Sequence, residues 1–319
     1  MKAEQIRQLT EKVTKNVAKV IVGKDDIVER MMVAIICQGH VLLEDVPGMG
    51  KTMLAKAIAR SIDCKFRRIQ LTPDLLPSDI TGIHFYNQKE GEFTFRAGPV
   101  FSNLVLADEI NRATPRTQSA LLECMEERQV TVDGITMILD APFLVIATQN
   151  PIDIQGTFPL PEAQIDRFLM KLKMGYPQTS EGVSILRRFK EQDPIALLEP
   201  VIDREELLEA QRSYTTVHVS DELLGYMVAL AEATRSHPDI MLGVSPRGTQ
   251  SLLRAVQVLA ILRGREYAIP DDIKEMAVPV LAHRMVVKGA LKLKAGMAEE
   301  ILLGILKKVP VPSEQFAPV

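Results

Sequence analysis

The sequence predicts an α/β protein in which helices cover both faces of a parallel sheet, followed by an all-helical domain. Apolar strand segments and amphipathic helices alternate from about residue 40 to Tyr176, which is typical of a parallel sheet. One strand runs directly into a glycine-spaced turn and a helix at Val41–Thr52. After Pro177 the strand signals stop and helical periodicity continues. We therefore expect a core domain over residues 1–178 and a helical domain, with its linker, over residues 179–319.

The composition excludes several classes of protein. The chain has 319 residues, 46% hydrophobic and 25% charged, which is enough apolar material for two globular domains. Its 38 basic and 41 acidic residues give a net charge of −3, which predicts no strong affinity for polyanions. Three cysteines without C-x-x-C spacing predict neither a disulfide framework nor a zinc site, and they suit a reducing cytoplasm. No apolar run approaches a membrane span, and the N-terminus alternates charges where a signal peptide would be apolar.

Two helices are expected before the first strand. Apolar residues recur at three and four positions from Ile6 to Val20, and again from Ile27 to Ile35. The first helix should end near Val22 and Gly23, and the second should lead into a strand at His40–Glu44.

The turn after this strand has the features of a phosphate-binding loop. Gly48 and Gly50 leave backbone N–H groups free to converge on phosphate oxygens, and the next helix points its N-terminus at the same anion. Lys51 supplies a positive charge for the phosphates, and Thr52 offers a hydroxyl to Mg²⁺. The strict sequence pattern has Gly where this chain has Asp45. An ordinary strand-turn-helix corner is the alternative interpretation.

A second strand and a hairpin are expected next. The strand lies at Arg67–Leu71, and Pro73 and Pro77 then interrupt a helix. The segments His84–Tyr86 and Phe93–Phe95 flank a polar turn, which is typical of a hairpin. The hairpin is either a surface feature or a working loop.

The hairpin turn is expected to rest on a compact apolar base. The turn, Asn87–Glu92, should project polar residues outward. The residues expected in the base are Phe85, Tyr86, Phe93 and Phe95.

Two carboxylates end the following strand. Asn103–Glu109 is apolar up to Asp108 and Glu109, which is typical of a strand buried on both faces. At the carboxyl end of a central strand, Asp108 can hold the Mg²⁺ shell, and Glu109 can orient or deprotonate an attacking water. Solvated acidic residues are the alternative. Because a phosphate-binding loop precedes them, we interpret the pair as the second half of a nucleotide site.

The remaining elements follow from periodicity and turn residues. In the core we expect a helix at Thr114–Glu127, a hairpin at Val130–Met137, a buried strand at Phe143–Thr148, a short helix from Glu162 and an alternating edge strand ending near Met174. Beyond it we expect helices near Glu181–Glu191, Arg204–Tyr214, Asp221–Ser236, Pro246–Arg263, Asp271–Arg284 and Ala298–Lys308.

Five segments carry a resemblance that covers nearly the whole chain. They read EDVPGMGKT, LADEINRATPRTQSALLECMEERQVTVDG, IATQNP, LPEAQIDRF and SPRGTQSLLR. In this order they resemble the MoxR family of AAA+ ATPases. The resemblance implies a P-loop αβα core and a helical lid, with ATP and Mg²⁺ bound between the subunits of a ring that is usually a hexamer. It also implies a chaperone-like action on partner proteins, often ones with a von Willebrand factor A domain.

The resemblance assigns roles by position. The hairpin after Gly82 matches an insert shared with magnesium chelatases and replicative helicases. The implied catalytic residues are Glu109 of Walker B, Asn150 as sensor 1, Arg167 as the arginine finger and Arg247 as sensor 2. The implied nucleotide-binding residues are Val22 and Gly23 at the adenine, Pro47, Gly48, Met49, Gly50, Lys51, Thr52 and Met53 around Walker A, and Asp108 of Walker B, with Thr52 and Asp108 at the metal.

Three of these assignments have simpler alternatives. Asn150, which precedes a proline, can be a turn residue. Arg167 can pair with Glu162 or Asp166 of its own subunit. Arg247 can be an ordinary first-turn residue, although a lid above phosphates needs such a cation. The five histidines lack ligand spacing, and we take them as structural.

An ATP-driven remodeller of a protein partner, acting as a ring of identical subunits without nucleic acid, is the favoured interpretation. A nucleic-acid motor is the first alternative, but the pI is about 6.0 and the hairpin turn has one Lys against two Glu. A P-loop kinase for a small molecule is the second. It would need an acceptor pocket, whereas Glu109 directly after Asp108 favours water as the acceptor.

Overall fold

The computed structural model describes residues 1–46, 48–150, 156–191, 194–289 and 296–312, and its packing divides the chain into two compact units. The larger unit, Gln8–Gln211, contains the main sheet, and the other combines Met1–Arg7 with Arg212–Val319. The sequence-based boundary at 178/179 was placed where strand signals stop, and the larger unit continues beyond it.

Hydrogen bonds account for this continuation. The guanidinium of Arg188 donates to Ala18 O (2.6 Å), and Gln211 donates to Ile35 O (2.7 Å). Both donors therefore belong with the helices that pack on the sheet.

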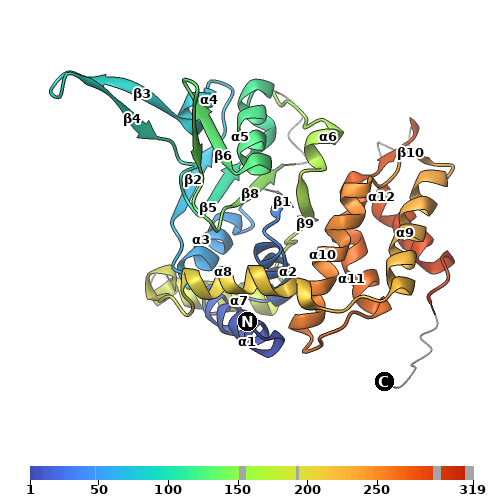
Figure 1. Ribbon diagram of the computed structural model, residues 1–319. Helices are drawn as coiled ribbons and strands as arrows, with labels where there is room; N and C mark the ends of the chain where they lie inside the picture. The colour runs from blue at the N-terminus through green and yellow to red at the C-terminus, as the bar shows by residue number, and fades with distance from the viewer. Residues whose placement is uncertain (47, 151–155, 192–193, 290–295, 313–319) are drawn as a thin grey trace. The chain divides into compact units, whose positions relative to one another are not determined.

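Five parallel strands form the sheet, in the order β2-β5-β8-β1-β9 (Figure 1). Since all strands run the same way, their carboxyl ends share one edge, as the sequence predicts. The strands are β1 (His40–Glu44), β2 (Phe66–Gln70), β5 (Leu104–Asp108), β8 (Leu144–Gln149) and β9 (Phe168–Leu172).

Helices cover both faces of the sheet, so the predicted three layers are confirmed. On one face, Val105 and Ala107 of β5 share a buried cluster with Leu121 and Met125 of α5. On the other, α3 packs against β2 and β5, and α2 packs against β1 and β9. The helices of this part of the chain are α1 (Ala3–Val17), α2 (Asp25–Ile36), α3 (Lys51–Ser61), α4 (Pro77–Thr81), α5 (Pro115–Glu127), α6 (Glu162–Ile165), α7 (Thr179–Glu191) and α8 (Arg204–Ser213), with short 3₁₀ helices η1 (Ile110–Arg112) and η2 (Pro194–Leu197).

Strand β9 lies at the sheet edge as expected, but it does not alternate. Phe168, Leu169, Met170 and Leu172 are all buried. Helices cover both faces here too, so no polar face is needed.

Two hairpins extend from the core. One pairs β3 (Gly82–Asn87) with β4 (Glu92–Ala97) and projects from the body of the unit, and the other pairs β6 (Gln129–Val132) with β7 (Ile135–Ile138) (Figure 1). Gly82 has φ +98°, and a Cβ at this position would lie 2.5 Å from Arg96 O, so only glycine fits at the foot of the first hairpin.

The prediction of a compact aromatic base for the first hairpin is wrong. Phe85, Tyr86 and Phe93 are 41%, 54% and 71% exposed. The base is instead formed by Phe95, whose ring centroid lies 5.2 Å from that of His84 and 5.5 Å from that of Phe101. Distance from the core explains the difference, because the hairpin extends beyond the core and its outer side chains have nothing to pack on.

The second unit is helical, as predicted, with one small addition. Ser220 and Ser245 cap two of its helices by accepting bonds from Leu223 N and Gly248 N. A two-stranded antiparallel ribbon is too short for its alternation to be recognised in the sequence. The elements are η3 (Tyr214–Thr216), α9 (Asp221–Ser236), β10 (Ile240–Leu242), α10 (Pro246–Leu262), α11 (Pro270–Leu281), η4 (Ala282–Arg284), β11 (Val286–Val287) and α12 (Met297–Lys308).

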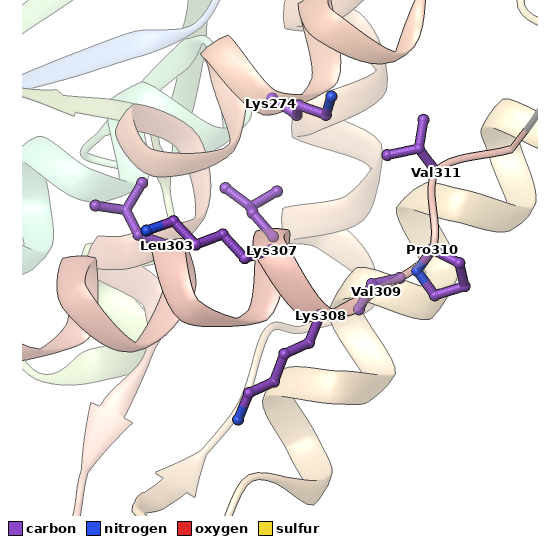
Figure 2. A pocket seen from close by; sticks show the side chains of 8 residues that line it. Lys274, Leu303, Lys307, Lys308, Val309, Pro310 and Val311 are labelled. Carbon is purple, nitrogen blue, oxygen red and sulfur yellow. The ribbon is translucent and has the colours of Figure 1, made fainter.

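A hollow of about 520 Å³ lies beside α12 in this unit (Figure 2). Lys274 is bonded to Asp271 (3.0 Å), and the Lys308 side chain extends away from Lys274. The lining therefore brings no group of charges together. It consists of Lys274, Leu303, Leu306, Lys307, Lys308, Val309, Pro310 and Val311.

Candidate active site

Three neighbouring strands bring the predicted site residues to one edge of the sheet. Strand β8 lies between β1 and β5. The glycine-spaced loop follows β1, Glu109 follows β5, and Asn150 follows β8. Ligands of open parallel sheets bind at this carboxyl edge.

The loop after β1 has the conformation of an anion cradle. Gly48 and Gly50 have φ values of +82° and +83°, and no atom lies within 4 Å of where a Cβ would stand on either. Helix α3 begins immediately after Gly50, so its free N–H groups face the loop. Met49, Thr52 and Met53 are half-buried. Pro47, also predicted in this site, lies outside the described residues.

Lys51 is held inside the loop. It is only 9% exposed, and its Nζ donates to Asp45 O (2.8 Å). Burial lowers the pKa of Lys51, while the carboxylates of Asp108, Asp45 and Glu109 oppose the shift. The ammonium is thus desolvated and close to three acidic groups.

One hydroxyl contacts the Asp108 carboxylate and the backbone N–H of Glu109 at the end of β5. Thr148 Oγ1 donates to Asp108 Oδ1 (2.6 Å) and accepts from Glu109 N (2.8 Å). Glu109 has φ +60°, a left-handed conformation that is uncommon outside glycine. This turn directs the chain out of the strand directly after Asp108.

Basic and amide side chains contact the same carboxylates. Arg68 donates to Asp108 Oδ2 from Nη2 (2.6 Å) and Nε (3.1 Å). Gln70 donates to Glu109 Oε2 (3.1 Å), and Arg112 Nε lies 3.2 Å from the same oxygen. Both carboxylates are therefore already oriented by their own chain.

The side chain of Asp45 has a structural role. Its Oδ2 accepts hydrogen bonds from Met174 N (2.6 Å) and Gly175 N (2.9 Å). The residue that departs from the strict glycine pattern thus joins the start of the loop to the chain that leaves β9.

Comparison with known proteins identifies the family. Residues 40–170 match the ATPase family associated with various cellular activities (AAA), and residues 232–302 match the AAA lid domain. Chaperone MoxR1 of Mycobacterium tuberculosis is 41% identical over 311 residues, covering 95% of this chain and 82% of that one. The chain belongs to the MoxR family of AAA+ ATPases.

Two further similarities extend over whole chains. The uncharacterized protein YeaC of Bacillus subtilis is 50% identical over 314 residues, covering 98% of each chain. A crystal structure from Cytophaga hutchinsonii has a TM-score of 0.91 at 38% identity and covers 98% of this chain and 97% of its own. The similarity therefore extends over the residues of both units.

The loop after β1 and the end of β5 are the segments predicted as Walker A and Walker B. Val22 is half-buried, and Gly23, with φ +67°, follows it in the loop after α1. Buried Asn150 follows Gln149, whose carbonyl accepts from Asp45 N (3.2 Å). Asn150 therefore lies at the carboxyl edge of the sheet, next to the start of the loop after β1.

The two predicted arginines are placed differently. Arg167 follows α6, and its Nη1 donates to Leu122 O (2.7 Å) of α5. Arg247 is exposed in the first turn of α10, in the other compact unit. Their roles at the nucleotide stay predictions.

Sequence reasoning missed four residues around the carboxylates: Arg68, Gln70, Arg112 and Thr148. Thr148 was inside a recognised segment, and a hydroxyl at the end of an otherwise apolar strand was a usable signal. Arg112 was inside a recognised segment too, and its position three residues after Glu109 was a usable signal. Arg68 and Gln70 carry none, because only strand order and register show which side chains of β2 face a carboxylate of β5.

The residues present fit a nucleotide and Mg²⁺. Open space at the glycines and the buried cation of Lys51 suit phosphates. Within the described ranges no group of three or more His, Cys, Asp or Glu could hold a metal ion. Asp108 and Thr52 offer oxygen ligands of the kind Mg²⁺ prefers, and Mg²⁺ usually takes its remaining ligands from phosphates and water.

Proposed function

We propose that this MoxR protein hydrolyses ATP to ADP and phosphate with Mg²⁺, and that as a ring oligomer it remodels a partner protein. The convergence of Lys51, Asp108 and Glu109 on one edge of the sheet is the observation that carries the proposal. A location in the cytoplasm is part of it, because three cysteines without paired spacing suit a reducing compartment.

Each residue has a distinct task in the proposed reaction. The N–H groups around Gly48 and Gly50 and the ammonium of Lys51 bind the phosphates. Magnesium, when bound through Thr52 and Asp108, supplies positive charge to the phosphate oxygens. Glu109, ordered at its backbone by Thr148, orients and deprotonates the water.

The proposal also includes residues that complete the site. Asn150 helps to place the water, and Arg247 of the lid and Arg167 of a neighbouring subunit stabilise the charge on the γ-phosphate. Val22 and Gly23 border the adenine. In this scheme Arg167 acts on the nucleotide of another subunit and Arg247 belongs to the lid. Neither side chain therefore has to lie beside the nucleotide within its own core unit.

A pair of variants tests the hydrolysis. Lys51→Ala should abolish binding of a fluorescent ATP analogue. Glu109→Gln should bind the analogue yet release phosphate at least about a hundredfold more slowly, the usual scale for a general base. If Glu109→Gln turned over at the wild-type rate, another residue would activate the water and this assignment would fail.

We infer that the projecting hairpin contacts the client, and that the client carries a von Willebrand factor A domain, as is frequent among partners of the family. Its exposed Tyr86 and Phe93, with ring centroids 5.4 Å apart, support the inference because exposed aromatic side chains are common in protein interfaces.

No helix of the described chain is long and apolar enough to cross a membrane.

Shortening of the hairpin tests this inference. Replacing Asn87–Glu92 by a tight turn should spare basal hydrolysis. A Glu109→Gln variant, which should bind ATP without hydrolysing it, serves as a trap that retains the client, and the same replacement in this variant should reduce the amount of client bound. A trap that holds the same client with and without the tip would show that the hairpin is only structural.

A further inference from the structure

Strand register places three polar side chains on one face of the sheet at its carboxyl edge. Arg68 pairs with Leu106 of β5, and Gln70 pairs with Asp108. Because residues two apart share a face, Arg68 and Gln70 lie on the same face as Asp108. Arg67 and Ile69, one position away, face the opposite side.

Both oxygens of Asp108 are engaged by the chain itself. Thr148 occupies Oδ1, and Arg68 occupies Oδ2 through two N–H groups at 2.6 and 3.1 Å. Asp108 is 14% exposed and Arg68 is 46% exposed, so the contact is shielded from solvent on the carboxylate side only. A guanidinium that donates two N–H groups to one oxygen leaves little room for a second cation at that oxygen.

The contact extends to the second carboxylate through Gln70. Arg68 Nη2 donates to Gln70 Oε1 (2.7 Å), which leaves the amide nitrogen of Gln70 to donate to Glu109 Oε2 (3.1 Å). Arg68 therefore orients the group that holds the proposed general base. Moving Arg68 away from Asp108 would also release the amide of Gln70.

We propose that Arg68 is a positioning residue that competes with Mg²⁺ for Asp108 and so sets how much magnesium strengthens nucleotide binding. The inference rests on the proposed function, since it needs a nucleotide at the Walker loop. Two positive charges held at one carboxylate repel each other, and the repulsion is larger where solvent screens it less. Entry of the metal therefore requires Arg68 to leave, and departure of Arg68 frees Glu109 from Gln70.

The test measures magnesium coupling rather than activity. The affinity for fluorescent ADP is determined in EDTA and at a series of Mg²⁺ concentrations, and the ratio of the two affinities is the coupling. Arg68→Gln should raise the coupling about threefold to tenfold, the scale of a partly exposed charged hydrogen bond, and leave the affinity in EDTA unchanged. Arg68→Lys, which keeps the charge without the planar fork, should lie between wild type and Arg68→Gln.

Arg67→Gln is the matched control, since it removes the same charge from the neighbouring position on the opposite face of β2. It should leave the coupling unchanged, and thermal melts should show all variants folded. Equal or weaker coupling in Arg68→Gln would overturn the proposal, as would a loss of affinity in EDTA, which would assign Arg68 to the phosphates. Wild type that binds no ADP under any condition would overturn the proposed function as well, a result distinct from failure of Arg68 alone.

Discussion

Thr148 joins the two central strands of the site through one oxygen: it donates to Asp108 Oδ1 at 2.6 Å and accepts from Glu109 N at 2.8 Å. The residue is fully buried on β8, so the rigid sheet fixes the hydroxyl. The carboxylate proposed to hold the metal and the backbone of the proposed base are thus set by the same group. Buried hydrogen bonds of this kind are costly to leave unmade.

Replacing this hydroxyl should impair turnover more than binding. Thr148→Val keeps the shape but leaves Glu109 N without its acceptor, and we expect about 1–2 kcal/mol of lost stability and at least about a tenfold fall in kcat. Phosphate release and nucleotide titrations on the purified protein measure both effects. Thr148→Ser retains the hydroxyl and should stay near wild type. An unchanged kcat in Thr148→Val would show that Glu109 needs no such support.

Restoring glycine at position 45 should raise neither the stability of the protein nor its affinity for nucleotide. Asp45→Gly restores the pattern but removes the acceptor for Met174 N and Gly175 N, so we expect a loss of about 1–3 kcal/mol with nucleotide affinity nearly unchanged. Asp45→Asn keeps one acceptor oxygen and should lose less. Urea unfolding and nucleotide titration provide the two measurements. Stability equal to wild type in Asp45→Gly would contradict the bridging role.

The role of Asp45 shows where sequence reasoning stops. The strands, the glycine loop and the carboxylates of β5 have local patterns, so their positions could be predicted. Asp45 bonds to Met174 and Gly175, 129 and 130 residues away, and no local pattern encodes that contact. The same holds for Arg68, whose partner is set by strand order, and for Phe93, whose exposure depends on how far the hairpin projects.

His40 should make the fold sensitive to acid. The imidazole is buried, its Nδ1 accepts from Val145 N, and its Nε2 therefore carries the proton donated to Met125 O, each at 2.9 Å. Burial, with a smaller effect of the Arg128 charge, lowers the pKa of His40 from 6.5 to about 4, although the bond to Met125 opposes the shift. The neutral ring fits this site, and the charged ring does not.

The direction in which stability changes with pH follows from proton binding by His40. Between pH 6.5 and about 4 the unfolded chain binds the His40 proton and the folded chain does not, so the stabilisation present above pH 6.5 is lost as the pH falls. The loss amounts to about 3 kcal/mol by pH 4. Urea unfolding of wild type and His40→Gln at pH 7 and 4.5 should show a smaller pH dependence in the variant. His84→Gln, on the projecting hairpin, is the control, and an equal pH dependence for wild type and His40→Gln would refute the assignment.

The last prediction is that Arg167 acts on the ATP of a neighbouring subunit. Arg167 immediately precedes β9, and Phe168 pairs with His40 at the start of β1. It therefore lies at the amino edge of the sheet, whereas the Walker residues lie at the carboxyl edge, roughly 15 Å away along a five-residue strand. Its guanidinium is bonded to Leu122 O, on α5. This placement suits a group that faces an adjoining molecule.

The decisive measurement mixes two variants that are each nearly inactive. Arg167→Ala should bind ATP but scarcely hydrolyse it, since a finger supplied by a neighbour can contribute three to five powers of ten. Lys51→Ala lacks the phosphate cation but keeps the finger, so some interfaces in a mixed ring would combine an intact site with an intact Arg167. Recovered hydrolysis supports action between subunits, and wild-type activity per mole should fall on dilution. No recovery despite demonstrated co-assembly would assign Arg167 to its own subunit, where the bond to Leu122 would make its role structural.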